Sequence, residues 1–484
     1  MHFGLIARLL GILIGMFSVT MLVPMLVGLY FNDGNSDTFF TAFAITLLAG
    51  LLIWYPVRNT ATRELSHRGG FLITALFWVV LSSFGTIPFL LSHEMNIDVT
   101  SAFFEAVSGL TSTGGTAITG LDDLPKSILY YRQQLQWLGG IGIIVITVAI
   151  LPILGIGGMQ LYRAEIPGPN KDEKITPRIT GTAKWIFSIY SILTVACALA
   201  YWWAGMSLFD AISHSFSTVS AGGFSTHDAS MGYFDNNVIL YIASFFMLIS
   251  ALSFTLHYYA MSDFKLSVYW EDSESKFFLC LLAFCCAVAF AGLLVHEQFI
   301  SGTDAAIHGV FQVISIFTTT GFASTDFANW PSFLPTWLIL LACIGGCAGS
   351  VAGGMKVLRS MIIFKQGTSE LFLLVHPQAV NPIKIKQRVV PPRVISAIWS
   401  FIAIYFYVFA FILITLMVTG LDFHTAFSAT IGSLNNLGVG IEGIASSYAD
   451  INIPAKWVLC LGMLLGRLEI FTLLVLFTPE FWRK

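Results

Sequence analysis

The chain has 484 residues, of which 56% are hydrophobic and only 11% are charged, and its formal net charge is −3. A soluble protein of ordinary composition carries about 25% charged residues, and the charges here are too few to cover a large water-soluble core. The composition therefore excludes an ordinary soluble protein and predicts an all-α protein that crosses a membrane several times.

Ten apolar stretches are long enough to cross a bilayer, because a membrane helix takes about 20 mostly apolar residues. The first of them starts like a signal peptide but continues past residue 28 without a small-residue cleavage site. We therefore interpret it as a retained membrane helix. The ten predicted spans are residues 5–31, 38–57, 70–92, 132–157, 184–204, 236–260, 276–296, 333–364, 394–419 and 454–478.

The connections between these spans alternate in charge. Most of the 24 Lys and Arg lie on one side, with Arg8, the connections at 58–68, 163–184, 265–276 and 359–393, and the last residues of the chain. The opposite connections are rich in Asp and Glu. The positive-inside rule predicts that the basic side and both termini are cytoplasmic, and an even number of spans agrees. The acidic outer side would concentrate cations at the mouth of a pathway.

A glycine motif occurs four times along the chain, as TSTGGT, VSAGGFST, TTTGFAST and NNLGVGIE. The glycines aligned in this way are Gly114, Gly222, Gly321 and Gly438, and each follows a long span and a half-length apolar segment. A period near 100 residues indicates internal duplication, with four similar units around one axis. The predicted units are an N-terminal helix pair at 1–68 and pore repeats at 69–170, 171–265, 266–392 and 393–484.

The half-length segments read SAFFEAVSGL, FDAISHSFSTV, AAIHGVFQVISIF and FHTAFSATIGSL, and they are too short to cross the bilayer. Non-helical backbone at membrane depth is tolerated only where it lines protein or a water-filled path. Each short helix with its glycine loop therefore predicts a re-entrant element that enters from the acidic side. The predicted architecture is about ten spans and four re-entrant pore loops around a pseudo-fourfold pore.

Four such loops could turn backbone carbonyls toward a common axis, because Gly permits the necessary conformations. Carbonyl oxygens can replace the water shell of a monovalent cation, and the negative C-terminal ends of the short helices would favour a cation there. No ring of carboxylates is present to form a strong divalent site. The predicted filter residues are Ser112, Thr113, Gly114, Ser220, Ala221, Gly222, Thr319, Thr320, Gly321, Asn436, Leu437 and Gly438.

The fourfold plan resembles the superfamily of potassium transporters that includes TrkH, TrkG and the KtrB subunits. The resemblance covers essentially the whole chain. The motifs that carry it are QLQWLGGIGIIV (134–145), GMQLYRAEIPGP (158–169), IGGCAGSVAGGMKV (344–357), LNNLGVG (434–440) and GRLEIFTLLVLFTPEFW (466–482). The extra N-terminal helix pair and the GMQLYRAE and GRLEIF blocks are similar to the TrkH/TrkG branch rather than to KtrB.

The resemblance implies low-affinity, regulated uptake of K⁺, and of other monovalent cations, across the bacterial inner membrane. It implies a homodimer in membrane lipid, with one pore in each protomer, and a cytosolic ring of TrkA-like nucleotide-binding subunits. This chain has neither a G-x-G-x-x-G after a strand nor a Walker A motif, so the nucleotide is expected on the partner. No nucleic acid is expected. The unequal loops, GG in two and GFA and GVG in the others, predict looser selectivity than in a fourfold potassium channel.

Two features below the predicted filter are candidates for a gate. Arg467 lies deep in the last span, where a charge is costly unless it faces protein or water. It could form a structural pair with Glu469 or a carbonyl, or it could be a cationic plug, which the resemblance supports.

The second feature is GGCAGSVAGGMK, which is too rich in Gly for a regular helix and could be a close helix contact or an unwound intramembrane loop. We favour the loop, whose predicted gating residues are Gly345, Gly346, Gly349, Gly353, Gly354 and Lys356.

Isolated polar residues in the short helices have more ordinary interpretations. His214 and His308 are predicted to be packing residues, since no second metal ligand lies at helical spacing. Glu105 and Asp210 lie near the predicted helix starts, where capping and cation attraction are equally plausible. The basic segment 356–393 is the longest cytoplasmic connection and the best candidate contact for a regulatory ring.

Two other functions compete with a regulated potassium pore. A secondary symporter that couples uptake to H⁺ or Na⁺ would favour carboxylates at the bilayer midplane, but only Glu469, beside Arg467, lies clearly inside a span. A membrane-embedded enzyme would need a triad, a metal cluster or a redox motif within a span. The spans contain none of these, and the seven Cys lie mostly in apolar runs without Cys-x-x-Cys spacing.

Overall fold

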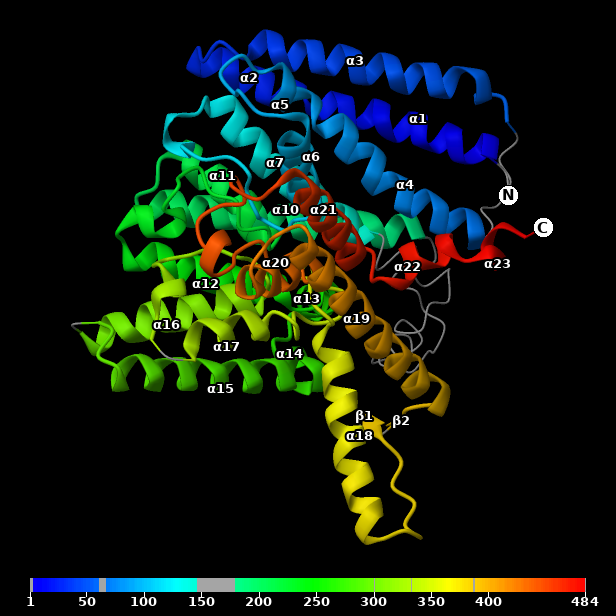
Figure 1. Cartoon of the computed structure of the whole chain (residues 1–484), viewed down its shortest axis with the longest axis vertical. Coiled ribbons are helices and arrows are strands. Elements are labelled where there is room, and N and C mark those ends of the chain that lie inside the picture. The colour runs from blue at the N-terminus through cyan, green and yellow to red at the C-terminus, as the bar shows by residue number, and fades with distance from the viewer. Residues whose placement is uncertain are drawn as a thin grey trace.

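The structure is a computed structural model that describes residues 3–60, 67–145, 179–299, 301–331, 333–385 and 388–483. These ranges are almost wholly helical (Figure 1). Their one sheet pairs β1 (Lys384–Ile385) with β2 (Arg388–Val389) in antiparallel register, Lys384 opposite Val389. The predicted GMQLYRAEIPGP block, the 170/171 unit boundary and the end of the 132–157 span lie outside the described residues.

The N-terminal helices lie along one edge of the molecule (Figure 1). They are α1 (Phe3–Thr20), α2 (Leu22–Phe31) and α3 (Ser36–Trp54), followed by a 3-10 turn at Tyr55–Val57. Helices α1 and α3 approach closely because glycines face each other: a Cβ on Gly11 would lie 2.9 Å from the Gly50 carbonyl oxygen, and one on Gly50 would lie 2.9 Å from the Gly15 nitrogen. This is the small-residue contact that membrane helices use when hydrophobicity cannot hold them together.

The remaining helices form four successive groups, each with a short helix in the middle. The first two groups are α4 (His67–Gly85), α5 (Ile87–Leu91), α6 (Val99–Leu110) and α7 (Lys126–Val145), then α10 (Ile179–Trp203), α11 (Leu208–Val219), α12 (Asn237–Ala251) and α13 (Phe254–Asp263). The third group is α14 (Ser267–Glu271), α15 (Ser273–Val295), α16 (Gly302–Phe317), α17 (Leu334–Leu341) and α18 (Val357–Val375). The fourth is α19 (Pro392–Val418), α20 (Phe423–Leu434), α21 (Ile453–Arg467), α22 (Phe471–Leu474) and α23 (Pro479–Trp482). Short 3-10 turns lie at Leu121–Asp123, Ser230–Phe234, Phe327–Asn329, Glu442–Ile444 and Val475–Phe477.

The short helices α6, α11, α16 and α20 coincide with the four predicted half-length segments. Packing connects each group to the next: α7 packs on α11, α12 on α16, α17 on α20, and α21 on α6. The fourth group thus returns to the first and closes a ring. The predicted all-α architecture with four pore helices around one axis is confirmed.

Several predicted spans are not straight helices. Six described helices are long and apolar enough to cross a membrane, and two further pairs bend by 97° (α12 and α13) and 108° (α21 and the helical turns at Phe471–Phe477). The predicted 333–364 span is divided into α17 and α18 by non-helical residues. The bend after α21 has a local cause, because Glu469 and Ile470 adopt left-handed backbone with φ of 53° and 55°.

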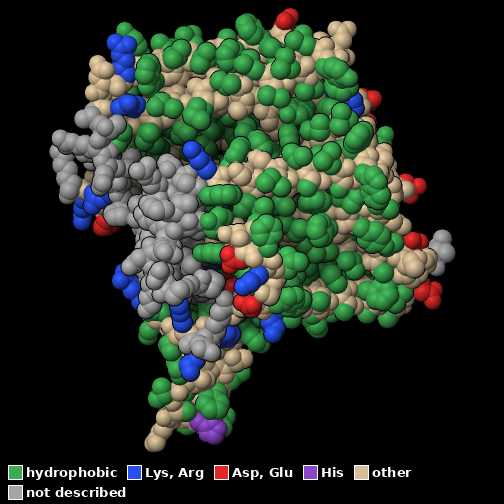
Figure 2. Space-filling model, turned by 180° about the vertical axis from the view of Figure 1, so that it is seen from behind, with side chains coloured by type: hydrophobic (Ala, Val, Ile, Leu, Met, Phe, Trp, Pro, Cys, Tyr) green, Lys and Arg blue, Asp and Glu red, His purple; other side chains and the backbone are tan. Residues whose placement is uncertain are grey.

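The surface is consistent with a lipid environment. Large apolar side chains such as Leu52, Trp203 and Phe284 are more than half exposed, and a broad hydrophobic belt covers the face shown in Figure 2. Lys and Arg gather along one side of this belt, and many Asp and Glu lie on the opposite side (Figure 2). The N- and C-terminal ends lie close together (Figure 1). The chain is a polytopic membrane protein.

Candidate cation filter

The four short helices end in the same way. One residue past each helix cap the backbone is left-handed, and the following amide donates back to a carbonyl five residues earlier, which is the Schellman motif. The left-handed residues are Ser112, Ala221, Thr319 and Asn436, with φ between 50° and 55°. The returning bonds run from Thr113 to Ser108 (2.9 Å), Gly222 to Ser217 (2.8 Å), Thr320 to Ser315 (2.8 Å) and Leu437 to Gly432 (2.8 Å).

These caps correct the predicted alignment of the second loop. Two positions after each of these left-handed residues lies a glycine with positive φ, namely Gly114 (88°), Gly223 (77°), Gly321 (84°) and Gly438 (77°). The sequence alignment expected Gly222 in this position, but the structure places Gly223 there. Gly222 instead corresponds to Thr113, Thr320 and Leu437, and Ser220 is the helix cap rather than an equivalent of Ser112. Adjacent glycines made both alignments possible from sequence.

The four glycines join neighbouring loops into a closed ring. A Cβ atom on any of them would lie less than 3.0 Å from a carbonyl oxygen of the next loop, which real Cβ atoms essentially never do. The pairs are Gly114 with Gly222, Gly223 with Thr320, Gly321 with Leu437, and Gly438 with Thr113. Two constraints thus require glycine at each of these positions: the positive φ of the residue and the close approach of a carbonyl from the next loop. The ring brings together the predicted residues Thr113, Gly114, Gly222, Thr320, Gly321, Leu437 and Gly438.

The chemistry of this ring is that of backbone oxygens. Thr113, Thr320 and Leu437 are fully buried, and their side chains carry no charge. Across the described ranges, no group of three or more His, Cys, Asp or Glu is placed to hold a metal ion. The short helices also direct their negative C-terminal ends at the ring. Such an arrangement suits a weakly held monovalent cation better than a divalent one.

Arg467 connects this ring to the glycine-rich segment. Its guanidinium is 4% exposed and donates to the Val351 carbonyl (3.0 Å), the Ser112 hydroxyl (3.2 Å) and the Gly139 carbonyl (3.3 Å). The alternative of a pair with Glu469 is wrong, because Glu469 binds Arg359 at 2.5 Å. Arg467 therefore bonds to carbonyls and to the first filter loop at the same time.

The glycine-rich segment is an unwound loop, as predicted, rather than a close helix contact. Gly345, Gly349 and Gly354 have positive φ, and so does Lys356 (75°), whose ammonium donates to the Ala352 carbonyl. The loop contacts the third filter loop, where the Gly353 amide donates to the Thr319 hydroxyl at 2.6 Å. Gly346 is packed against the end of α12, since a Cβ there would lie 3.0 Å from the Ala251 carbonyl oxygen.

The Gly loop is also bound to the break between α12 and α13. The Cys347 amide donates to the Ala251 carbonyl (2.9 Å), and the Phe254 amide donates to the Gly349 carbonyl (3.1 Å). Glu274 of α15 accepts from the Ala348 amide at 2.6 Å. The bend in the predicted 236–260 span therefore has a physical reason, because the helix gives up its own hydrogen bonds to bind this loop.

Comparison with known proteins agrees with this geometry. Residues 35–484 match the family model TrkH, described as a cation transport protein. The chain belongs to the TrkH family of cation transport proteins. It is 54% identical, over the full length of both chains, to the Trk system potassium uptake protein TrkH of Vibrio parahaemolyticus, and 50% identical to that of Escherichia coli K12. The Escherichia coli TrkG protein is 40% identical over 100% of this chain and 99% of its own length.

The crystal structure of the potassium transporter TrkH from Vibrio parahaemolyticus superposes with a TM-score of 0.93 at 51% identity, covering 100% of each chain. The predicted TrkH/TrkG branch is thereby confirmed. The relatives bear transporter names and not enzyme names, in agreement with the prediction that the chain is not an enzyme.

In this TrkH-family chain, the helix caps differ from those predicted. The short helices are capped by Asp98, Ser207, Ser301 and Asp422, whose side chains accept from amides of the first turn. Glu105 is no cap, because α6 begins at Val99 and places Glu105 in mid-helix, fully buried against Arg132 at 2.7 Å. Asp210 does assist its cap, since Ser207 and Asp210 exchange hydrogen bonds of 2.6 and 3.0 Å.

The Glu105–Arg132 pair was not expected from sequence. Arg132 also donates to the Ser225 carbonyl (3.1 Å), while Glu105 accepts from the Ala117 amide (2.9 Å). The pair thus binds the return segments of the first and second TrkH-family loops to each other. A fully buried ion pair of this kind is costly to break, because the remaining partner would be left uncompensated.

The two predicted packing histidines have ordinary partners. His214 lies between the Asp210 carbonyl and the Ser225 hydroxyl, both at 2.9 Å, and His308 contacts the Ser324 hydroxyl at 3.0 Å. The prediction of hydrogen-bonded packing residues is confirmed.

A third histidine, not singled out by sequence, joins two repeats on the acidic side. His227 lies 2.5 Å from Asp122 and 3.6 Å from Asp210, and it stacks on Tyr233 with ring centroids 3.5 Å apart. Burial alone would lower the pKa of His227, but hydrogen bonds to Asp210 and Asp122 hold the pKa above its ordinary value. His227 therefore favours its charged form when it connects the two repeats.

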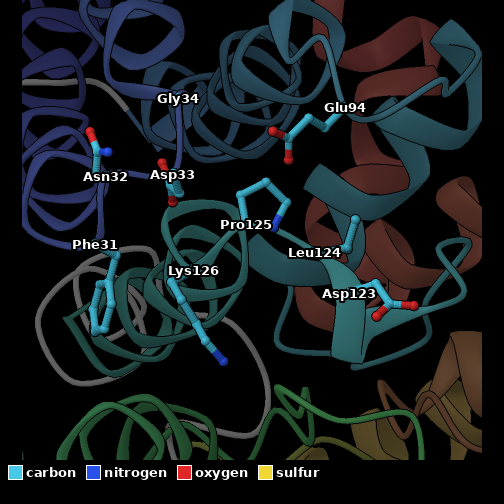
Figure 3. A pocket seen from close by; sticks show the side chains of 9 residues that line it. All are labelled: Phe31, Asn32, Asp33, Gly34, Glu94, Asp123, Leu124, Pro125 and Lys126. Carbon is cyan, nitrogen blue, oxygen red and sulfur yellow. The ribbon is translucent and has the colours of Figure 1, made fainter.

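A cavity of about 520 Å³ opens on the acidic side beside the N-terminal helices (Figure 3). Asp33, Glu94 and Asp123 line it, together with Lys126. The Asp33 carboxylate is already bonded to the amides of Ser127 (2.8 Å) and Asn35 (3.2 Å). The carboxylates that line the cavity therefore add negative charge to this face of the TrkH-family fold. Asp33 also connects the N-terminal helices to α7 through its bond to the Ser127 amide.

Proposed function

We propose that this protein takes up potassium, and other monovalent cations less selectively, across the bacterial inner membrane through the ring of four loops. The closed set of glycine–carbonyl contacts carries the proposal, because it brings four backbones close enough to share one ion. Relatives at 50% identity and above are Trk system potassium uptake proteins, which supports K⁺ as the cargo.

The proposed path starts at the acidic face. Its carboxylates raise the local cation concentration, and the ion then exchanges water for the carbonyls of Thr113, Gly222, Thr320 and Leu437. These four positions carry two Thr side chains, one Leu side chain and one Gly, so the walls of the filter are unequal. We expect the selectivity for K⁺ over Na⁺ to be lower than four identical walls would give.

We propose that Arg467 and the Gly loop together form the gate. The Arg467 charge repels a cation leaving the filter, and its bond to Val351 holds the loop beneath the ring. The predicted gate glycines Gly345, Gly349 and Gly354, with positive φ, supply the backbone freedom for the loop to rearrange. Lys356 adds a second positive charge at the end of the loop.

The proposed assembly is a homodimer in membrane lipid, regulated by a cytosolic TrkA-like ring that carries the nucleotide. Helix α18 projects from the body of the molecule (Figure 1) and exposes Leu371, Leu374 and Val375 at 66% or more, which supports a protein contact there. Helix α18 belongs to the basic segment 356–393, and we propose that this side is cytoplasmic together with both termini. The pore repeats are proposed to divide at residues 68/69, 170/171, 265/266 and 392/393.

The test is growth of a potassium-uptake-deficient bacterium at low potassium, with and without a TrkA-type partner. Rescue that depends on the partner supports the proposal, and failure with normal membrane insertion overturns it.

Reversal potentials under imposed Na⁺ and H⁺ gradients distinguish the alternative symporter. A potential that the separate permeabilities of K⁺ and Na⁺ account for excludes coupling, whereas one that shifts with the H⁺ gradient, or by more than the Na⁺ permeability allows, establishes it.

A further inference from the structure

The second filter loop lacks a side chain that the other three loops have. The residues before the positive-φ glycine are Thr113, Thr320 and Leu437 in the first, third and fourth loops, but Gly222 in the second. A side chain at Gly222 has no room, because an added Cβ would lie 2.5 Å from Oε1 and 2.9 Å from Nε2 of Gln136. The side chain of Gln136, from α7 of the first repeat, occupies the space left by the missing one.

Gln136 also bonds to the backbone on both sides of Gly223. Its Nε2 donates to the Gly222 carbonyl at 2.7 Å, and its Oε1 accepts from the Phe224 amide at 3.1 Å. A carbonyl can only accept and an amide N–H can only donate, so these partners determine the orientation of the Gln136 amide. Gln136 is fully buried, so both bonds lie inside the protein.

The other loops hold the corresponding residue differently. The Thr113 hydroxyl lies 2.7 Å from that of Thr111, and the Thr320 hydroxyl lies 2.8 Å from that of Thr318. In the part of the chain that the structure describes, no side chain donates to the carbonyl of Thr113, Thr320 or Leu437. Among the four carbonyls, in the described residues, the Gly222 carbonyl alone is thus held by a side-chain donor.

We propose that Gln136 is a positioning residue for ion selectivity, which replaces the missing side chain of the second loop and holds the Gly222 carbonyl in place. The inference rests on the proposed function of the ring as the filter. Gly222 and Gly223 both lack a Cβ, so the backbone on both sides of the Gly222 carbonyl is less restricted than in the loops with Thr or Leu before the glycine. Without Gln136 this wall would adapt its carbonyl to a smaller ion, and Na⁺ would be rejected less well.

The first test replaces Gln136 by Leu, which keeps the volume and removes both hydrogen bonds. We expect the K⁺/Na⁺ permeability ratio, measured as a bi-ionic potential in proteoliposomes, to fall about tenfold, with K⁺ flux retained. The matched control is Gln134→Leu, because Gln134 is a buried glutamine on the same helix whose amide bonds to Thr20 of α1, outside the ring. An unchanged ratio in Gln136→Leu, with normal insertion, overturns the proposal.

A double-variant cycle tests the claim that the Gln136 side chain fills the space beside Gly222, even if the single variants transport poorly. Gly222→Ala should abolish K⁺ uptake, because its Cβ overlaps Gln136, and Gln136→Ala in addition should restore uptake by providing room. Uptake by Gly222→Ala equal to wild type, or no recovery in the double variant, contradicts the proposal.

Gly321→Ala tests the ring itself at a site remote from Gln136, since its Cβ would overlap the Leu437 carbonyl. If Gly321→Ala abolishes uptake or changes the permeability ratio and Gln136→Leu leaves the ratio unchanged, the filter stands and only the role of Gln136 is wrong. If neither variant changes the ratio, the assignment of the filter is wrong.

Discussion

The filter ring and the Gly loop beneath it are both non-helical, but they are held by different forces. The ring is held by backbone geometry, with the same cap on each short helix and a glycine against a carbonyl in each wall. The Gly loop is held by side chains from elsewhere, including Arg467, Thr319 and Glu274, together with two backbone bonds to the break between α12 and α13. We therefore expect the ring to keep its arrangement and the proposed gate to move, because the loop depends on a few hydrogen bonds that can exchange.

The largest expected effect is in the ring. Gly438→Val should abolish cation uptake, because a Cβ at Gly438 overlaps the Thr113 carbonyl and Val is strongly disfavoured at φ of 77°. Uptake of ⁸⁶Rb⁺ into proteoliposomes measures the loss. Gly420→Val is the matched control, since Gly420 also has positive φ (102°) but has open space around it. If both variants lose the same activity, backbone strain and not ring closure is the cause.

Arg467→Ala should have the next largest effect and in the opposite direction. Removal of a buried charge and of its bond to Val351 frees the exit of the ring, so cation flux should rise about tenfold or more. The same proteoliposome assay applies. Arg359→Ala is the comparison, because Arg359 is a cation of the same region that bonds to Glu469 and to the Met355 carbonyl at the end of the loop, and not to Val351 or Ser112. Unchanged flux in Arg467→Ala would remove this residue from the gate.

Thr319→Val should have a smaller effect that reports on the contact between the two regions. The substitution keeps the side-chain shape but removes the acceptor for the Gly353 amide, which weakens the Gly loop's attachment by about 1 kcal/mol. Open probability, recorded in single-channel patches, should increase several-fold with selectivity unchanged. A change in selectivity without a change in opening would mean that Thr319 belongs to the ring alone.

The smallest expected effect concerns pH and His227. The pKa of His227 is raised in the folded protein, so the charged form stabilises the fold. That stabilisation is fully present below the ordinary pKa of about 6.5 and is lost as pH rises through the folded value. The melting temperature in detergent should therefore fall between pH 6 and pH 8 more in wild type than in His227→Gln. Equal shifts in the two proteins would contradict this role.

The sequence predicted the four short helices and their glycine loops well, because half-length apolar segments before a glycine are a distinctive pattern. The filter residues it named lie in or next to the ring, except that the second loop is shifted by one residue. That error has a physical origin: in AGG either glycine can adopt positive φ, and only contacts with the third loop decide between Gly222 and Gly223.

Other features could not be predicted from the sequence, because they depend on contacts between residues that are far apart along the chain. The bend between α12 and α13 follows a Leu-Ser step that would fit a straight helix, and it exists because the Gly loop competes for its amides. Gln136 looked like any polar residue on an amphipathic helix, and its partners are 86 and 88 residues away. The start of α6 at Val99 was missed because Asp98 lies outside the apolar segment.

The closure of the ring by a single polypeptide has a consequence for how such a protein can evolve. In an assembly of four identical subunits, every substitution near the axis is introduced four times. Here a substitution at Thr320 or Leu437 alters one quarter of the ring and leaves three quarters intact. Single mutations can therefore change ion preference in small steps, and a compensating residue such as Gln136 can arise for one wall alone.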